Sequence, residues 1–304
     1  MPKRLISYAP PRDYHMDMRL GEGWHQRNFL TQVVIPSLFK KRTGVRIKPH
    51  FPQLTSDQLG ITWIGHASFL IQTEKHFILI DPNWARWLKV IKRLRHPGFE
   101  LEELPAIDLV LVTHAHFDHL DKKTLRAIAA HQPIVVPEHV GNLVNGLGFE
   151  KVHELTPWQV LEHEELKITL TPAFHWGARL LHDRHRGFGG FLIEHSGKTL
   201  FHCGDSAYFS GFREIGERAN IDIALLPIGA YDTISGRDAH MNPEEALKAF
   251  QELKAKTFIP MHYGTFPLGY EPLEEPPVRL MASAKKQGLE DRISILKEGE
   301  TVVF

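Results

Sequence analysis

The chain has 304 residues, 42% of them hydrophobic and 24% charged, which is the composition of a globular protein with a sizeable core. Its 36 basic and 36 acidic residues cancel, so the overall charge gives no case for a nucleic-acid partner, although residues 39–48 form a local basic stretch. A single cysteine, Cys203, excludes an intrachain disulfide, and the sequence has neither a signal-peptide core nor an apolar run long enough to cross a membrane. We therefore expect a cytoplasmic protein.

The chain divides by pattern near residue 59. Residues 1–58 are rich in proline, arginine and histidine and show little periodicity, which predicts an N-terminal arm that packs on the core. One helix is expected in this arm, over residues 24–42, with a break near Pro36. Residues 59–304 are expected to form a single domain, because strands and helices alternate there without a polar hinge.

Within that domain, strand and helix patterns alternate to the end of the chain. Helices are expected at 121–131, 138–148, 211–220, 242–254 and 276–288. The start at Asn242 is well marked, because an N-cap residue is followed by proline and two glutamates. Strands are expected at 60–73, 75–82, 106–114, 133–137, 167–174, 189–205 as a hairpin, 221–231, 257–262 and 293–304. This order predicts layers of mixed α/β structure.

A cluster of ligand-type residues follows the apolar run 106–114. His114, His116, Asp118 and His119 form the pattern H-x-H-x-D-H at the carboxyl end of an expected buried strand, where sites of α/β sheets gather. Residues two apart in extended chain point the same way, so His114 and His116 can share one ion, and the other two can face a second ion after the chain turns. Imidazole and carboxylate suit zinc, iron or manganese. The competing interpretation is a polar loop before a helix.

Three later residues follow other expected strands in the same manner. They are His175, Asp205 and His262. Each alone could be a hydrogen-bonded structural residue, but their recurrence at successive strand ends favours a shared metal site. A carboxylate such as Asp205 could bridge two ions that would otherwise repel each other.

These motifs together resemble the metallo-β-lactamase superfamily. Within it, the chain is most similar to the branch that contains the phospholipase D acting on N-acyl-phosphatidylethanolamine. The resemblance runs from about residue 60 to the end and rests on the stretches TWIGHASFLIQ, AIDLVLVTHAHFDHLD, PAFHW, GDSAYF, LLPIGAYD, HMNPEEA and MHYGTF. It implies an αββα sandwich of two mixed β-sheets flanked by helices, with a dinuclear zinc site.

Carried over residue by residue, the resemblance assigns the ligands to two ions. His114, His116 and His175 would hold one Zn²⁺, with Mn²⁺ or Fe²⁺ as alternatives. Asp118, His119 and His262 would hold the other, and Asp205 would bridge both. Every ligand position of the family pattern carries the expected residue type, which argues against a metal-binding protein that has lost catalysis.

Further residues are expected around the ligands. His66, Asp81 and Asp121 follow or end expected elements and are predicted to orient ligand side chains. The resemblance places His240 near the reaction centre, where it would be catalytic together with Asp118 and Asp205, and would contact the substrate. Tyr231 is predicted to contact the substrate as well.

The expected activity is that of a zinc-dependent phosphodiesterase of phospholipase D type, acting on a small-molecule or phospholipid phosphodiester through a metal-bridging hydroxide. The alternative is hydrolysis of a lactone or another carboxylic ester at the same site. No nucleic-acid partner is expected. The helix at 24–42 carries apolar residues beside Lys40, Lys41 and Arg42, which fits either packing on the core or peripheral membrane contact. The oligomeric state does not follow from the sequence.

Overall fold

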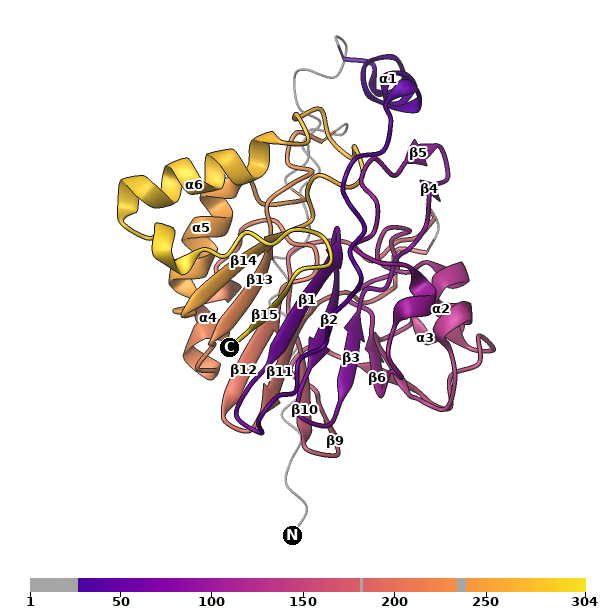
Figure 1. The fold of residues 1–304 in the computed structure, drawn as a ribbon, viewed down its shortest axis with the longest axis vertical. Coiled ribbons are helices and arrows are strands. Elements are labelled where there is room, and N and C mark those ends of the chain that lie inside the picture. The colour runs from indigo at the N-terminus through magenta and orange to yellow at the C-terminus, as the bar shows by residue number, and fades with distance from the viewer. Residues whose placement is uncertain (1–26, 181–182, 234–238) are drawn as a thin grey trace.

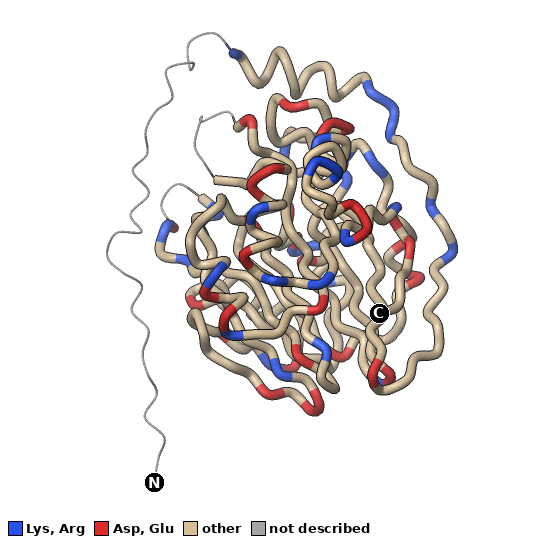
Figure 2. Tube along the Cα trace, turned by 90° about the vertical axis from the view of Figure 1, so that its left-hand side faces the viewer, with Lys and Arg blue, Asp and Glu red and all other residues tan. Residues whose placement is uncertain are grey.

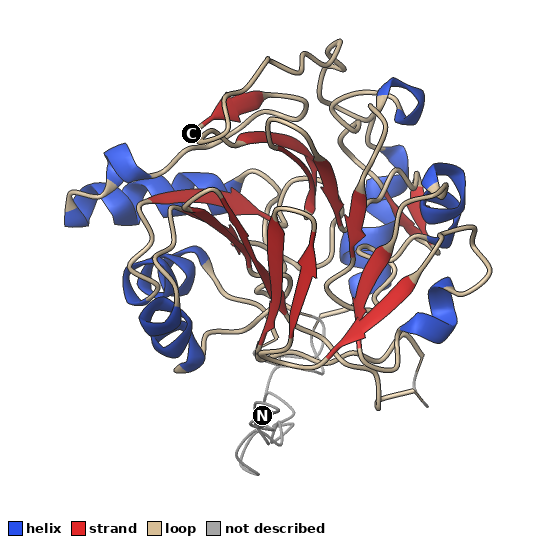
Figure 3. Cartoon of the chain, turned by 90° about the horizontal axis from the view of Figure 1, so that it is seen from below, coloured by secondary structure: helices blue, strands red, loops and turns tan. Residues whose placement is uncertain are grey.

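Two mixed β-sheets pack face to face, and helices cover the outer face of each (Figures 1 and 3). The computed structural model describes residues 27–180, 183–233 and 239–304, so the first residues of the helix expected at 24–42 lie outside it. This arrangement confirms the expected αββα sandwich. Among the described residues, no helix is both long and apolar enough to span a bilayer.

The first sheet has seven strands in the order β15-β1-β2-β3-β6-β7-β8. Strands β15, β1, β2 and β3 pair antiparallel, whereas β3, β6, β7 and β8 pair parallel. Strand β15 lies beside β1 and so returns the C-terminal residues to the first sheet. The strands are β1 (Gly60–Gly65), β2 (Ser68–Gln72), β3 (Phe77–Ile80), β6 (Leu109–Leu111), β7 (Ile134–Pro137), β8 (Val152–Leu155) and β15 (Thr301–Val303).

The second sheet has six strands in the order β14-β13-β12-β11-β10-β9. The four strands from β9 to β12 form an antiparallel meander, and β12, β13 and β14 are parallel. Its strands are β9 (Val160–His163), β10 (Leu166–Thr171), β11 (Gly190–His195), β12 (Lys198–His202), β13 (Ile223–Pro227) and β14 (Thr257–Met261). Strands β10, β12, β13 and β14 therefore run in one direction, and their carboxyl ends share one edge of the sheet.

The helices divide between the two outer faces. Leu125 of α2 (Lys122–Ile128) and Val144 of α3 (Gly141–Val144) pack with side chains of the first sheet. The larger core joins both inner faces to Ile215 of α4, Phe250 of α5 and Leu280 of α6. The bounds of these last helices are α4 (Gly211–Arg218), α5 (Pro243–Glu252) and α6 (Glu275–Gln287), and short 3-10 turns occupy Leu101–Glu103 and Glu290–Arg292.

Several elements differ from the sequence-based prediction. The helix expected at 138–148 is reduced to α3, because Gly146 and Gly148 adopt positive φ angles of 77° and 115°. Strands β8 and β9 were not predicted, since their residues are largely half-buried or exposed and give a weak apolar pattern. The strands expected at 293–304 form only β15.

The segment before residue 59 contains a short helical region that stands at one end of the molecule (Figure 1). A π-helical turn at Leu30–Val34 leads into α1 (Ile35–Phe39), and the change of helix type falls beside the predicted break at Pro36. Next to α1 lies a small hairpin of β4 (Trp87–Leu88) and β5 (Ile91–Lys92). The division of the chain into an arm over 1–58 and a domain over 59–304 stays a prediction.

The cap of α5 gives a direct test of local stability. The Asn242 side chain accepts a hydrogen bond from the Glu245 backbone at 2.9 Å, and the Glu245 carboxylate accepts one from the Asn242 backbone at 3.0 Å. We expect Asn242→Ala to lower the free energy of unfolding by about 1 kcal/mol. The measurement is urea denaturation. Gln251→Ala, at an exposed position of the same helix, should change stability little, and equal stabilities for both variants would contradict the assigned cap.

Candidate metal centre

The predicted ligands lie at the carboxyl ends of strands from both sheets. The loop of residues 112–121 follows β6 of the first sheet, as His66 follows β1 and Asp81 follows β3. In the second sheet, the loops after β10, β12 and β14 carry His175, Asp205 and His262. Because these strands end at the same edge of the sandwich, side chains far apart in sequence converge there.

One group of possible ligands consists of His114, His116, His175 and Asp205, whose donor atoms all lie within 4.8 Å of one another. The Nε2 atom of His114 is 2.9 Å from Nδ1 of His116 and 3.6 Å from Oδ2 of Asp205. The Nε2 atom of His175 is 3.3 Å from the same His116 nitrogen. Three imidazoles and a carboxylate thus face one small volume.

A second group consists of His66, Asp118, His119 and His262, within the same 4.8 Å limit. The Asp118 carboxylate lies at its centre, with Oδ2 2.9 Å from Nε2 of His66 and 3.3 Å from Nε2 of His262. The Nε2 atom of His119 is 3.6 Å from the same oxygen. The structure therefore brings Asp118, His119 and His262 together as predicted, and adds His66 to them.

Asp205 connects the two groups. Its Oδ2 atom is 3.1 Å from Nε2 of His119, and its Oδ1 atom is 3.2 Å from Nε2 of His262, so it faces the second group as well as the first. The tight approach depends on Gly204, which has a φ angle of 62° and where an added Cβ would lie 2.8 Å from the Gly189 carbonyl oxygen. Asp205, which was predicted to bridge two ions, thus lies between the two groups of possible ligands.

Contacts behind the ligands fix the orientation of their rings. The Nδ1 atom of His119 donates to Oδ2 of Asp81 at 2.7 Å, and Nδ1 of His175 donates to the Ala239 carbonyl at 3.0 Å. In each ring the Nε2 lone pair is then directed to the centre. Asp81 itself accepts from the backbone and hydroxyl of Thr113 at 2.7 Å and 2.6 Å.

Three residues of the site have a left-handed backbone although they carry bulky side chains. The φ angles are 58° for His66, 44° for Asp81 and 61° for His262. Tertiary contacts hold this conformation, since the His262 backbone donates to the His66 carbonyl at 3.1 Å and the His66 backbone donates to the Thr265 hydroxyl at 3.0 Å. Strained backbone that surrounding contacts maintain is concentrated at functional sites.

The electrostatics of the centre favour a cation. Burial raises the pKa of Asp205, but His119 and His262 outweigh burial and hold its pKa well below the usual range, so the carboxylate is charged. Burial lowers the pKa of His262, yet Asp205 and Asp118 outweigh burial and raise it to about 9. Burial lowers the pKa of His114 well below 6.5, which keeps that ring neutral. His262 therefore carries positive charge beside the buried carboxylates, and bound divalent cations would supply that charge in its place.

Unpartnered atoms provide the test of whether these residues fit metal ions. Among the described residues, three buried ligand-type atoms that face the centre lack a hydrogen-bond partner: Nε2 of His119, Nε2 of His262 and Oδ1 of Asp205. Leaving such atoms unsatisfied is costly, and divalent cations coordinated by them would remove that cost. The donor set of imidazoles and carboxylates fits zinc, iron or manganese.

His240 and Tyr231 have different surroundings. The His240 ring is largely buried and stacks on His262 at 5.0 Å between ring centroids, with Nδ1 3.9 Å from Oδ2 of Asp205. Burial is the main cause that lowers its pKa to about 4. In contrast, the Tyr231 hydroxyl donates to Glu275 at 2.7 Å, and its ring contacts Arg279, so none of these described contacts is with the histidines.

Asp121 has a structural contact that explains its position. Its side chain accepts from the backbone of Lys123 and Thr124 and so caps α2, directly after the ligand loop. It therefore fixes where the loop ends. No described hydrogen bond joins Asp121 to a predicted ligand, and its proposed part in orienting ligands stays a prediction.

Two residues that hold the ligand loop were missed in the sequence. Arg179 donates from Nη1 to the carbonyls of Ala115 and Leu120 at 2.7 Å and 2.9 Å, which bracket His116–His119, and its guanidinium lies 4.0 Å from the centroid of the Phe117 ring. Asn83 donates to the carbonyls of Phe117 and Asp118. Neither residue belongs to a recognisable motif of metal ligands. Their contacts with the ligand loop therefore become visible only in the folded structure.

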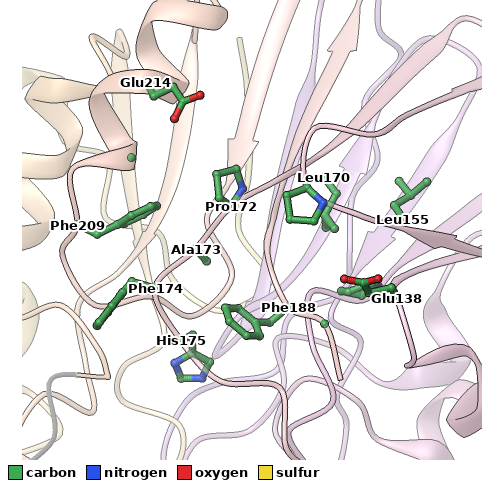
Figure 4. A pocket seen from close by; sticks show the side chains of 14 residues that line it. Glu138, Leu155, Leu170, Pro172, Ala173, Phe174, His175, Phe188, Phe209 and Glu214 are labelled. Carbon is green, nitrogen blue, oxygen red and sulfur yellow. The ribbon is translucent and has the colours of Figure 1, made fainter. Parts of the chain in front are cut away.

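An apolar cavity of about 210 Å³ adjoins His175. Phe174, Phe188 and Phe209 line it, together with Leu170 and other residues, and Figure 4 shows the three rings around the space with His175 at its edge. A substrate bound at the centre could therefore place an apolar group in this cavity.

Comparison with known proteins agrees with this geometry. The family model of the beta-lactamase superfamily domain matches residues 76–263, and the chain belongs to this superfamily. The chain is 33% identical over 259 residues to the mitochondrial N-acyl-phosphatidylethanolamine-hydrolysing phospholipase D of Saccharomyces cerevisiae, a match that covers 80% of this chain and 55% of that protein. These findings confirm the resemblance stated from the sequence motifs.

Two further relatives match over nearly their whole length. A metal-dependent hydrolase of Methanopyrus kandleri is 32% identical over 245 residues, covering 79% of this chain and 98% of that protein. The solved structure of Igni18, a metallo hydrolase of Ignicoccus hospitalis, superposes with a TM-score of 0.64 at 28% identity and covers 81% of this chain and 98% of its own.

The carboxylate behind His119 gives a prediction about metal affinity. Asp81→Asn keeps the size of the side chain but weakens the charge-assisted hydrogen bond to Nδ1, so we expect metal affinity to fall about tenfold to 100-fold. Competition with a chelator measures this. Asp108→Asn is the matched control, because that carboxylate accepts a backbone hydrogen bond at the start of a strand in the same sheet, and no hydrogen bond between described residues joins it to a ligand. An unchanged affinity for Asp81→Asn would contradict the orienting role.

Arg179 gives a second prediction, on metal retention. Arg179→Lys retains the charge but loses the planar group that spans two carbonyls and stacks on Phe117. We expect the variant to lose metal to a chelator about tenfold faster, because the loop of Asp118 and His119 is less constrained. Arg218→Lys is the control, since Arg218 also stacks on an aromatic ring, that of Trp158, in another part of the fold. Equal loss rates in the two variants would exclude the loop-holding role.

Proposed function

We propose that this chain is a metal-dependent hydrolase that cleaves phosphodiesters. The observation that carries the proposal is the pair of ligand groups joined by Asp205, within a fold of the beta-lactamase superfamily. We infer two Zn²⁺ ions as the cofactors, one held by His114, His116 and His175, the other by Asp118, His119 and His262, with Asp205 between them. A pair of divalent ions supplies an activated water and neutralises negative charge on the substrate.

The protein residues contribute orientation and charge. Asp81, Ala239 and Thr113 hold the ligand rings with their lone pairs directed inward. Asp118 is held between His66 and His262. Burial raises the pKa of Asp118, but His119, followed by His262 and His66, outweighs burial and holds that pKa well below its usual range. Contacts of this kind, made by the protein itself, would spare the ligands from reorganising when substrate binds.

His240 is the residue that we propose to contact the substrate. It lies beside Asp205 and His262, and its buried Nδ1 atom has no hydrogen-bond partner in the described part of the chain. With its pKa lowered to about 4 by burial, the ring is neutral at pH 7. A neutral imidazole has one N–H group, which can donate to a phosphoryl oxygen.

The choice of a phosphodiester is supported by two relatives. The proteins of Saccharomyces cerevisiae and Caenorhabditis elegans, 33% and 31% identical to this chain, are named as phospholipases D that hydrolyse N-acyl-phosphatidylethanolamine. The match spans only 55% and 64% of those proteins. The apolar cavity beside His175 supports a substrate that carries an apolar group next to its phosphate.

A substrate panel on one metal-loaded preparation tests this proposal. We expect hydrolysis of bis(p-nitrophenyl) phosphate and of N-acyl-phosphatidylethanolamine in detergent, and weaker or no hydrolysis of lactones. Asp205→Asn should lower phosphodiesterase activity by at least about 100-fold and reduce the bound metal, because it removes the charge between the two ions. Asp57→Asn, at an exposed position, is the control.

Two results would contradict the proposal. Hydrolysis of lactones in preference to phosphodiesters would assign the same site to carboxylic esters. Full activity after complete removal of metal would exclude a metal-dependent reaction.

A further inference from the structure

Positive charge is concentrated in two segments of this otherwise neutral chain. Residues 27–56 contain six lysines and arginines, residues 82–99 contain five, and neither segment has an aspartate or glutamate. The whole chain has 36 residues of each sign, so this separation is local. In Figure 2 the segment that follows α1 carries blue and no red.

The same segments expose large apolar side chains. Phe39 at the end of α1 is 83% exposed, and Val90 at the tip of the β4–β5 hairpin is 63% exposed. Ile35, Leu38 and Trp87 are also exposed. Of the helical residues 30–39, only Val34 and Ser37 are buried, so most of the apolar face of this region has no partner in the described part of the chain.

These residues belong to one continuous surface. Lys92 of β5 donates from Nζ to the carbonyls of Leu38 and Lys40 at 2.9 Å and 2.7 Å, which ties the end of α1 to the hairpin. Figure 1 shows α1 directly above β5 and β4. We call this the basic apolar surface, and it comprises Ile35, Leu38, Phe39, Trp87 and Val90 with Lys40, Lys41, Arg86 and Lys89.

The lysines and arginine of this surface have no carboxylate partner among the described residues. Other cations of the two segments do: Arg27 pairs with Asp232, Arg46 with Glu100, and Arg95 with Glu274 and Glu298. The unpaired cations of the two segments thus include the four that accompany the exposed apolar side chains, whereas Lys92 and Arg93 donate to backbone carbonyls. Their charge is available to a negatively charged partner.

The basic apolar surface borders the candidate metal centre. The Nζ atom of Lys89 lies 4.3 Å from the centroid of the Phe117 ring, and Phe117 stands between His116 and Asp118 in the ligand loop. Asn83, at the base of the hairpin segment, donates to the carbonyls of Phe117 and Asp118. A partner on this surface would therefore lie next to the ligand loop.

We propose that the basic apolar surface docks on a bilayer containing anionic lipids. Exposed phenylalanine, tryptophan and aliphatic side chains would enter the acyl boundary, while the flanking lysines would contact lipid phosphates. The apolar side chains and the cations of the surface both fit this partner. A nucleic acid would contact the cations and leave the aliphatic side chains in water. A docked membrane would present its own phosphodiesters to the site, and this consequence rests on the function proposed above. Binding to the membrane does not depend on that function.

Vesicle co-sedimentation of the full chain tests the docking. The probes are vesicles of phosphatidylcholine alone and vesicles with about one third phosphatidylserine, at low and high salt. We expect binding to the anionic vesicles that weakens with salt. Replacing Phe39, Trp87 and Val90 by serine should weaken binding at least tenfold, and Lys40→Gln with Lys41→Gln should weaken binding to the anionic vesicles at least threefold.

Matched controls lie on α6. Val278→Ser removes another exposed valine, and Lys285→Gln with Lys286→Gln removes two exposed lysines, so these variants should bind vesicles as the unaltered chain does. All variants should keep the thermal midpoint and the hydrolysis of soluble bis(p-nitrophenyl) phosphate. That second readout separates loss of docking from failure of the proposed reaction.

Three outcomes would overturn the docking proposal. The first is no sedimentation of the folded chain with anionic vesicles, and the second is equal binding by the surface variants and the α6 controls. The third is salt-sensitive binding to a single-stranded oligonucleotide, lost in the lysine variant and kept in the serine variant, without binding to vesicles. That result would assign the surface to nucleic acid.

Discussion

The arrangement of the site depends on one buried charge, the carboxylate of Asp205. It lies among the rings of His114, His119, His175 and His262, with nitrogen atoms between 3.1 and 3.8 Å from its oxygens. An isolated carboxylate in this position would be very unfavourable, and its burial requires compensating positive charge. Divalent ions held by these ligands would supply that charge. The surrounding strands, loops and strained backbone would then serve to place ligands around one carboxylate.

Each half of the sandwich supplies part of this environment and holds the other half in place. The first sheet contributes the loop after β6 and the second contributes His175, Asp205 and His262. Arg179, which belongs to the loop after β10, donates to backbone carbonyls of the loop after β6, and the His262 backbone donates to the carbonyl of His66. These contacts cross between the sheets at the ligands themselves, so the packing of the sandwich and the geometry of the site are coupled.

The sequence was informative where a residue type that binds metal ions follows the end of an expected strand. The pattern from His114 to His119 and the single residues His175, Asp205 and His262 could be recognised because metal ligands need particular atoms at particular elements. Arg179 and Asn83 could not, since their function depends on carbonyls that only the folded chain brings near. Strands β8 and β9 were missed because exposed edge strands lack a clear apolar period, and the length of the helix near residue 141 was overestimated because two glycines end it.

The central claim is that Asp205 lies between two metal ions, and anomalous diffraction from crystals grown with zinc measures this most directly. The account predicts two anomalous peaks at the zinc absorption edge, one beside His114, His116 and His175 and the other beside Asp118, His119 and His262, with the Asp205 carboxylate contacting both. A single peak, or two peaks of which neither contacts Asp205, would contradict it.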